Sequence, residues 1–167
     1  MIRRCVFTLT ALAALYFVLA LPVGTAIAQT ARELVGTWTW VSLNTIRPDG
    51  TRVQQMGANP KGVLIFDSNG RYFYLISRSG RPKFSSNNIN EGTPEENKAT
   101  TQGSLAYSGT YSVSDKTIIF RVEASTFPNA EGAEQRRVFA LTGDELKYTN
   151  PASVAGGTAE AVLRRVK

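Results

Sequence analysis

The chain has 167 residues, of which 19 are Lys or Arg, 13 are Asp or Glu, one is Cys and none is His. This length is typical of one domain, and the absence of His excludes Ser-His-acid and Cys-His nucleophiles, His-ligated metal sites and haem with a proximal His. With 43% hydrophobic and 10% aromatic residues, the sequence predicts a folded chain rather than a disordered one.

The first 28 residues have the pattern of a signal peptide. A basic pair, Arg3 and Arg4, precedes an apolar run from Cys5 to Leu21. The segment Ala26–Ala28 then forms an A-x-A site, so cleavage is predicted before Gln29. The apolar run has 17 residues, which is the short end of a membrane-spanning helix, so a retained anchor is the alternative.

Cleavage would leave residues 29–167 as one exported domain, periplasmic or secreted. This domain contains no cysteine, so disulfides and thiolate metal sites are excluded from it. No cofactor is predicted, and no stable membrane insertion is expected once the signal peptide is removed.

Two pairs of adjacent arginines, Arg136-Arg137 and Arg164-Arg165, bear on nucleic-acid binding. Residues 29–167 carry 17 basic and 13 acidic groups, a modest excess of +4. Both pairs lie in segments expected to be extended, where successive side chains point to opposite faces. No basic stripe results, so nucleic-acid binding is not predicted.

From Val35 onward, short β-prone runs alternate with turn residues, and this pattern predicts nine strands. The turns at Arg47–Gly50 and Ser68–Gly70 contain the Pro, Asn and Gly residues that tight turns require. Short connections favour antiparallel neighbours, because a parallel crossover needs about a dozen residues or more. The predicted strands are Val35–Asn44, Thr51–Gln55, Gly62–Asp67, Arg71–Arg78, Leu105–Val113, Thr117–Ala124, Gln135–Leu141, Glu145–Thr149 and Ala159–Val166.

One connection, between Arg78 and Leu105, is long and polar. Within it, Thr93 and Glu96 have the spacing of a capping box, and Pro94 suits the first helical position. The sequence therefore predicts a short helix over about Pro94–Gln102. The segment from Ser79 to Gly103 is expected to cover the open end of the fold, with a solvated linker as the alternative.

Apolar side chains alternate along the predicted strands and mark one buried face. Trp38 and Trp40 share a parity, as do Ile118, Phe120, Val122 and Ala124, and Arg137 shares the parity of Phe139 and Leu141. An antiparallel up-and-down barrel of eight to nine strands buries such a face and leaves no free edge. The interior of a barrel of this size can hold one small ligand.

The segment Gly36-Thr37-Trp38 resembles the G-x-W signature of lipocalins, and the chain from Leu34 to about Val166 resembles the bacterial and fungal lipocalin-like domain family, a calycin-type barrel. The resemblance implies that Trp38 is structural, closing the base of the barrel beneath Arg164 or Arg165. The further runs that carry the resemblance are Lys61–Val63, Asp67–Tyr72, Gly92–Glu96, Ala106–Tyr111 and Val122–Asn129.

The favoured interpretation is a binding module for a small hydrophobic or aromatic ligand, with an acidic group as an option. An inward guanidinium at Arg137 needs an acidic partner, which is either a ligand anion or a protein carboxylate. The predicted ligand-binding residues are Trp40, Tyr74, Tyr107, Tyr111, Phe120, Arg137 and Phe139.

Two other classes of function stay open. One is a small lyase or isomerase that transfers a proton with a Tyr or a carboxylate, for which Asp67 and Glu123 are the strand carboxylates. The other is an envelope interaction protein whose barrel is filled by side chains and holds no ligand. No catalytic residue is assigned, and the sequence leaves the oligomeric state open.

Overall fold

A computed structural model describes residues 31–167, so the predicted signal peptide lies outside the described residues. Nine strands form one antiparallel sheet, with a helix, α2 (Pro94–Gln102), and a short 3-10 turn, η1 (Pro128–Ala130). Residues 31–34 add one helical turn before the first strand. The strands are β1 (Gly36–Ile46), β2 (Arg52–Val53), β3 (Lys61–Phe66), β4 (Arg71–Ser77), β5 (Ser104–Ser114), β6 (Thr117–Ser125), β7 (Glu134–Thr142), β8 (Glu145–Asn150) and β9 (Thr158–Arg165).

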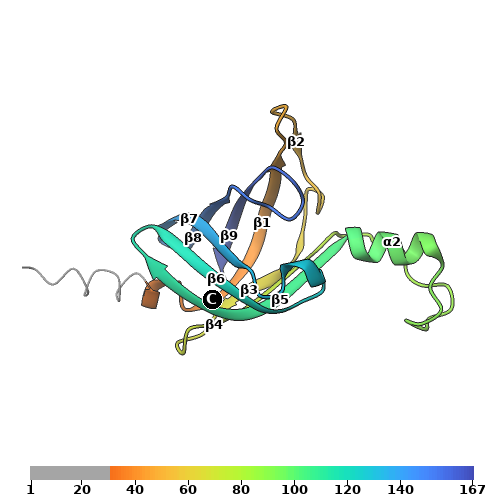
Figure 1. Cartoon of the computed structure of the whole chain (residues 1–167), viewed down its shortest axis with the longest axis horizontal. Helices are drawn as coiled ribbons and strands as arrows, with labels where there is room; N and C mark the ends of the chain where they lie inside the picture. Colours follow the sequence, from red (N-terminus) through yellow and green to blue (C-terminus); the bar gives the residue numbers. More distant parts are fainter. Residues whose placement is uncertain (1–30) are drawn as a thin grey trace, which may run out of the picture.

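The sheet closes on itself, as the sequence predicted. From β3 to β9 each strand pairs with the next one along the chain, and β1 pairs with both β3 and β9. The result is a closed eight-stranded barrel, with β2 as an extra short strand on the edge of β1 (Figure 1). All the predicted strand bounds agree to within two residues, although β2 keeps only two of its five predicted residues.

Alternation places one apolar face inside the barrel, and bulges modify it at two points. In β1 the register with β9 shifts between Trp40 and Ser42, so Trp38 and Trp40 are followed inward by Leu43 rather than by Ser42. In β6 a shift opposite Ser108 and Gly109 turns Ala124 outward, so its predicted place on the buried face is wrong. After a one-residue bulge, every following side chain on that strand points to the face opposite the one that simple alternation predicts.

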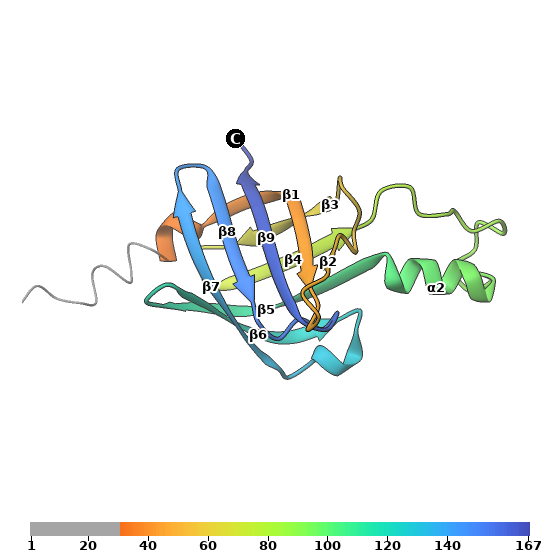
Figure 2. The ribbon, with the colours of Figure 1, turned by 90° about the horizontal axis from the view of Figure 1, so that it is seen from above.

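Helix α2 forms where predicted, but the segment around it does not cover the barrel. Thr93 and Glu96 make the reciprocal capping-box bonds, with Pro94 as the first helical residue. The segment 79–103 projects away from the barrel end in two perpendicular views (Figures 1 and 2), and no residue of α2 is buried. The expectation of a cover was therefore wrong, because a cap fixes where a helix starts and not where it points.

Within residues 31–167, none of the helices has the length and apolar character needed to cross a lipid bilayer.

Figure 2 shows that β1 begins at the end of the barrel opposite α2. Trp38, the third residue of β1, closes this end. Trp38 is fully buried, and its Nε1 donates a hydrogen bond to the Leu34 carbonyl at 2.8 Å. The guanidinium carbon of Arg165 lies 4.2 Å from the centre of the Trp38 ring, and Arg165 Nη1 donates to the Val35 carbonyl at 2.8 Å. Arg164 is exposed, because it is the next residue along the strand and points to the opposite face.

Removing this closure should destabilise the protein. We expect Trp38→Ala to lower the free energy of unfolding by about 3–5 kcal/mol, as large-to-small core changes do. Arg165→Ala should cost about 0.5–2 kcal/mol through the lost cation–π contact. Urea denaturation measures both, with Arg164→Ala as the matched control that stays near wild type. Equal effects of Arg164→Ala and Arg165→Ala would contradict this assignment.

The projecting segment should be the first place that a protease cuts. It offers exposed backbone and few apolar anchors, whereas the strands are tied by long ladders of hydrogen bonds. Limited digestion with proteinase K, which cleaves with little sequence preference, followed by mass spectrometry should therefore give first cleavage within residues 79–103. First cleavage in the loop 127–134 would show that the projecting segment is the better protected of the two.

Candidate ligand-binding site

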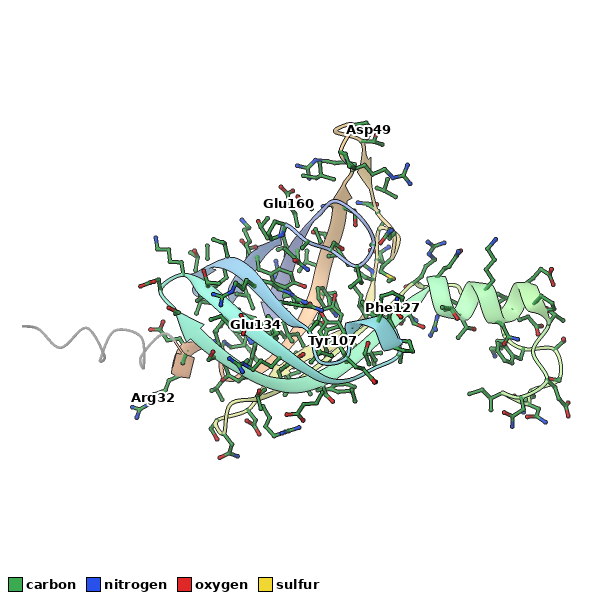
Figure 3. All side chains as sticks on the ribbon, in the orientation of Figure 1. Arg32, Asp49, Tyr107, Phe127, Glu134 and Glu160 are labelled. Carbon is green, nitrogen blue, oxygen red and sulfur yellow. The ribbon has the colours of Figure 1, made fainter. Side chains whose placement is uncertain are left out.

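A cavity of about 600 Å³ opens at the barrel end from which α2 projects. Its wall includes apolar side chains such as Leu43, Met56 and Ile76, and its rim includes Phe127 and residues 100–102 at the end of α2. Figure 3 shows Tyr107 inside the barrel and Phe127 at the open end. This volume is within the range of about 300–1,000 Å³ that is usual for small-molecule sites.

The cavity meets the packed core at Arg137, a buried cation on β7. Arg137 lines the cavity together with Tyr74, Tyr107 and Tyr148, and only 2% of it is exposed. Its guanidinium carbon lies 4.4 Å from the ring centre of Phe120, 4.7 Å from that of Tyr148, 5.2 Å from that of Tyr74 and 5.7 Å from that of Tyr107. Four aromatic rings therefore surround the charge, and such contacts are attractive.

The hydrogen bonds of Arg137 are incomplete. Its Nη2 donates to Gln135 Oε1 at 2.9 Å and to the Tyr107 hydroxyl. Its Nε and Nη1 are buried and have no hydrogen-bond partner in the described part of the chain, and the ion pairs found there leave Arg137 out. The protein carboxylate considered as a partner for Arg137 is thus absent from residues 31–167. Two buried donors on a cation are left without an acceptor, which is an unfavourable arrangement.

The charge states around Arg137 are fixed at physiological pH. Burial works against the charge of Arg137, but its interactions with Tyr107, Tyr148 and Tyr74 outweigh burial and raise its pKa. Burial raises the pKa of Tyr107, with Arg137 opposing this effect, and burial raises the pKa of Tyr148 to about 12. The pKa of Tyr74 is raised well above its usual value by burial as well. The site therefore presents one permanent cation and three phenols that keep their protons.

The sequence was also compared with known proteins. A family model described as a lipocalin-like domain matches residues 35–165. The chain belongs to this family of lipocalin-like domains.

A curated relative of this lipocalin-like protein is the 4'-hydroxy-3'-methoxypropiophenone carrier protein ppsC of Aspergillus oryzae, 33% identical over 91 residues. The match covers 48% of this chain and 82% of the relative. Among solved structures, an uncharacterized protein from Bacteroides eggerthii aligns with a TM-score of 0.40 and 15% identity, over 80% of this chain and 99% of that one. Secretory abundant heat soluble protein 4 from Ramazzottius varieornatus aligns with a TM-score of 0.36 and 16% identity, over 80% of this chain and 95% of that one.

Three of the seven predicted ligand-binding residues line the cavity of the lipocalin-like barrel, namely Tyr74, Tyr107 and Arg137. Phe120 is fully buried and lies against Arg137 without lining the cavity. Trp40 donates its Nε1 hydrogen to the Leu75 carbonyl at 2.8 Å and packs edge-on against Tyr74. Phe120 and Trp40 therefore contact the cavity-lining residues Arg137 and Tyr74 without lining the cavity themselves.

The other two predicted residues, Tyr111 and Phe139, also do not line the cavity. The Tyr111 hydroxyl donates to the Asp67 carbonyl at 3.0 Å, and its ring packs against Phe66. Phe139 is buried two residues further along β7 than Arg137. Parity along a strand correctly placed both side chains against the core, where Phe139 is buried and Tyr111 is partly buried. Parity gives no information about depth along the barrel axis, and both residues lie outside the cavity.

Several lining residues were not among those predicted. Tyr148 shares the inward face of β8 with Leu146 and Asn150, so its alternation with Leu146 was a signal that could have identified it. Gln135 shares the parity of Arg137 and accepts its hydrogen bond. Thr45 lines the cavity only because the bulge in β1 turns it inward, which no local pattern indicated.

Replacing Arg137 by an apolar residue of similar length should not destabilise the empty barrel. Because Arg137 lacks a carboxylate partner and leaves two donors unpaired, Arg137→Met should leave the free energy of unfolding unchanged or raise it by about 1–4 kcal/mol. Denaturant unfolding without ligand measures this, with Phe120→Ala as the control that loses about 3–5 kcal/mol. A loss of 3 kcal/mol or more in Arg137→Met would assign the arginine a structural role.

Proposed function

We propose that this protein is an exported carrier that binds a small hydrophobic or aromatic molecule in its barrel, with an acidic or other accepting group directed at Arg137. One observation carries the proposal: a buried cation with two unpaired donor nitrogens borders a cavity whose volume is usual for small-molecule sites. A ligand acceptor would complete the hydrogen bonds that the barrel leaves open. Export rests on the signal-peptide pattern of residues 1–28.

The tyrosine side chains in the cavity wall favour an aromatic ligand. Tyr74 and Tyr107 stack with ring centres 4.2 Å apart and an angle of 14°, and Tyr148 completes the tyrosine lining. Aromatic rings pack well against such surfaces, and phenol hydroxyls offer hydrogen bonds at the same time. The related protein is named as a carrier of 4'-hydroxy-3'-methoxypropiophenone, an aromatic molecule, which supports the same ligand class here.

The two other classes of function have less support. A filled barrel does not fit a cavity of about 600 Å³. A carboxylate-based lyase or isomerase lacks its base, because Asp67 accepts hydrogen bonds from the Asn69 and Arg71 backbone and Glu123 pairs with Arg71 at 2.6 Å. Neither carboxylate lines the cavity. Tyr107 does, and its raised pKa makes it a hydrogen-bond donor rather than a base.

Binding of acids and of their neutral esters tests the proposal. Fatty acids and aromatic acids, each beside its methyl ester, should raise the melting temperature of the purified protein, the acids most. Arg137→Gln should weaken binding of the acids by about 1.5–3 kcal/mol, the scale of a charge-assisted hydrogen bond, and change ester binding little. Isothermal titration calorimetry gives the affinities.

Arg136→Gln is the matched control for this experiment, because Arg136 is adjacent, exposed and paired with Glu134 on the outer face. This variant should bind acids as wild type does. The proposal fails if wild type binds no member of the panel, and the role of Arg137 fails if both variants lose the same affinity.

A further inference from the structure

A second hollow lies beside the mouth of the barrel cavity, at the base of the projecting segment. This groove has a volume of about 550 Å³ and is more open than the barrel cavity. Residues of the loop 77–84 form most of its wall, together with Lys61 at the start of β3 and two residues further along the projecting segment, Asn87 and Thr100. Arg78 and Thr100 line both the groove and the barrel cavity, so the two hollows are adjacent at these residues.

The groove is basic. Lys61, Arg78, Arg81 and Lys83 line it, and none of these four side chains is in an ion pair within the described residues. Arg78 is held at the junction of the two hollows, because its Nε and Nη2 both donate to the Gln55 carbonyl. With Arg137, five cations border the combined path, one of them at its inner end.

Acidic side chains are excluded from this path. The chain has 13 Asp and Glu residues, yet none of them lines the groove or the barrel cavity. Several lie in ion pairs on the outside of the barrel, such as Glu123, Glu134 and Glu160. Others cap turns or the helix, as Glu96 does by accepting from the Thr93 and Ser85 backbone. The path thus combines uncompensated positive charge with the absence of negative charge.

We propose that the basic groove is the access route of the ligand, and that the ligand arrives as an amphiphilic organic anion, with an apolar ring or chain and one carboxylate or sulfonate. A groove lined by charges of one sign concentrates ions of the opposite sign and raises association rates by about 10–1,000-fold. The anion would pass from Lys83 and Arg81 to Arg78 and end near Arg137. Amines would be repelled along the whole path. This inference rests on the proposed carrier function and adds to it the charge of the ligand and the route by which it enters.

Two fluorescent probes with the same aromatic skeleton test the route. 8-Anilinonaphthalene-1-sulfonate carries a permanent negative charge, and N-phenyl-1-naphthylamine is its neutral counterpart. Stopped-flow mixing with the full purified protein gives the association rate of each probe. Between about 0.01 M and about 1 M salt the Debye length falls from about 30 Å to about 3 Å, so the sulfonate should associate more slowly as salt rises and the neutral probe should not.

The double variant Arg81→Gln/Lys83→Gln removes two groove charges that do not line the barrel cavity. At low salt it should slow association of the sulfonate by about tenfold, flatten the salt dependence and leave the dissociation rate unchanged. Lys116→Gln/Arg164→Gln is the matched control, because it removes the same charge from exposed residues outside both hollows. It should associate with both probes as wild type does.

The outcomes distinguish failure of the carrier function from failure of the access route. If neither probe binds, the carrier function fails and the access route fails with it. If the neutral probe binds but the sulfonate does not, or if groove and control variants slow the sulfonate equally, the access route is wrong while the carrier function stands. Slowing by the groove variant alone, lost at high salt, supports the route.

Discussion

Pairing of β9 with β1 closes the sheet, and the other features of the molecule depend on that closure. Eight pairs of residues join the two strands, from Trp38 opposite Arg165 to Ile46 opposite Thr158. An open sheet would leave its inner face in water, whereas the closed one removes that face from solvent. Closure therefore creates the cavity and also buries Arg137.

Isolation of this cation gives the site its chemistry. Aromatic rings and one tyrosine hydroxyl surround Arg137, and Gln135 accepts one of its hydrogens, but no carboxylate neutralises it within residues 31–167. A buried charge without a counter-ion lowers stability unless something binds to it. In the proposed carrier function the arginine serves a ligand rather than the packing, and the basic groove at the mouth would extend the same preference for negative charge outward.

Much of the fold followed from local patterns in the sequence. Turn residues such as Asn69 and Gly70 fixed the hairpins, period-two alternation fixed the strands, and the Thr93–Glu96 capping box fixed the start of α2. These signals act over a few residues, which is why the strand bounds were correct to within two residues. The projecting direction of α2 depends on tertiary contacts, and so it was not predictable in this way.

The candidate site was predicted less completely than the fold. Alternation identified Arg137, Tyr74 and Tyr107 as inward, but it equally selected Tyr111 and Phe139, which lie in the packed part of the barrel. Depth along the axis depends on the tilt and stagger of the strands, which a single strand does not encode. Thr45 needed the bulge in β1, a feature of pairing between distant segments.

Native mass spectrometry of the protein purified from its own host tests the central claim most directly, because it asks whether the barrel carries a ligand. The account predicts a small-molecule adduct that is released on denaturation, is detected as an anion, and is lost from Arg137→Gln but retained by Arg136→Gln. A spectrum showing only the bare polypeptide in wild type, or an adduct that both variants retain equally, would contradict it.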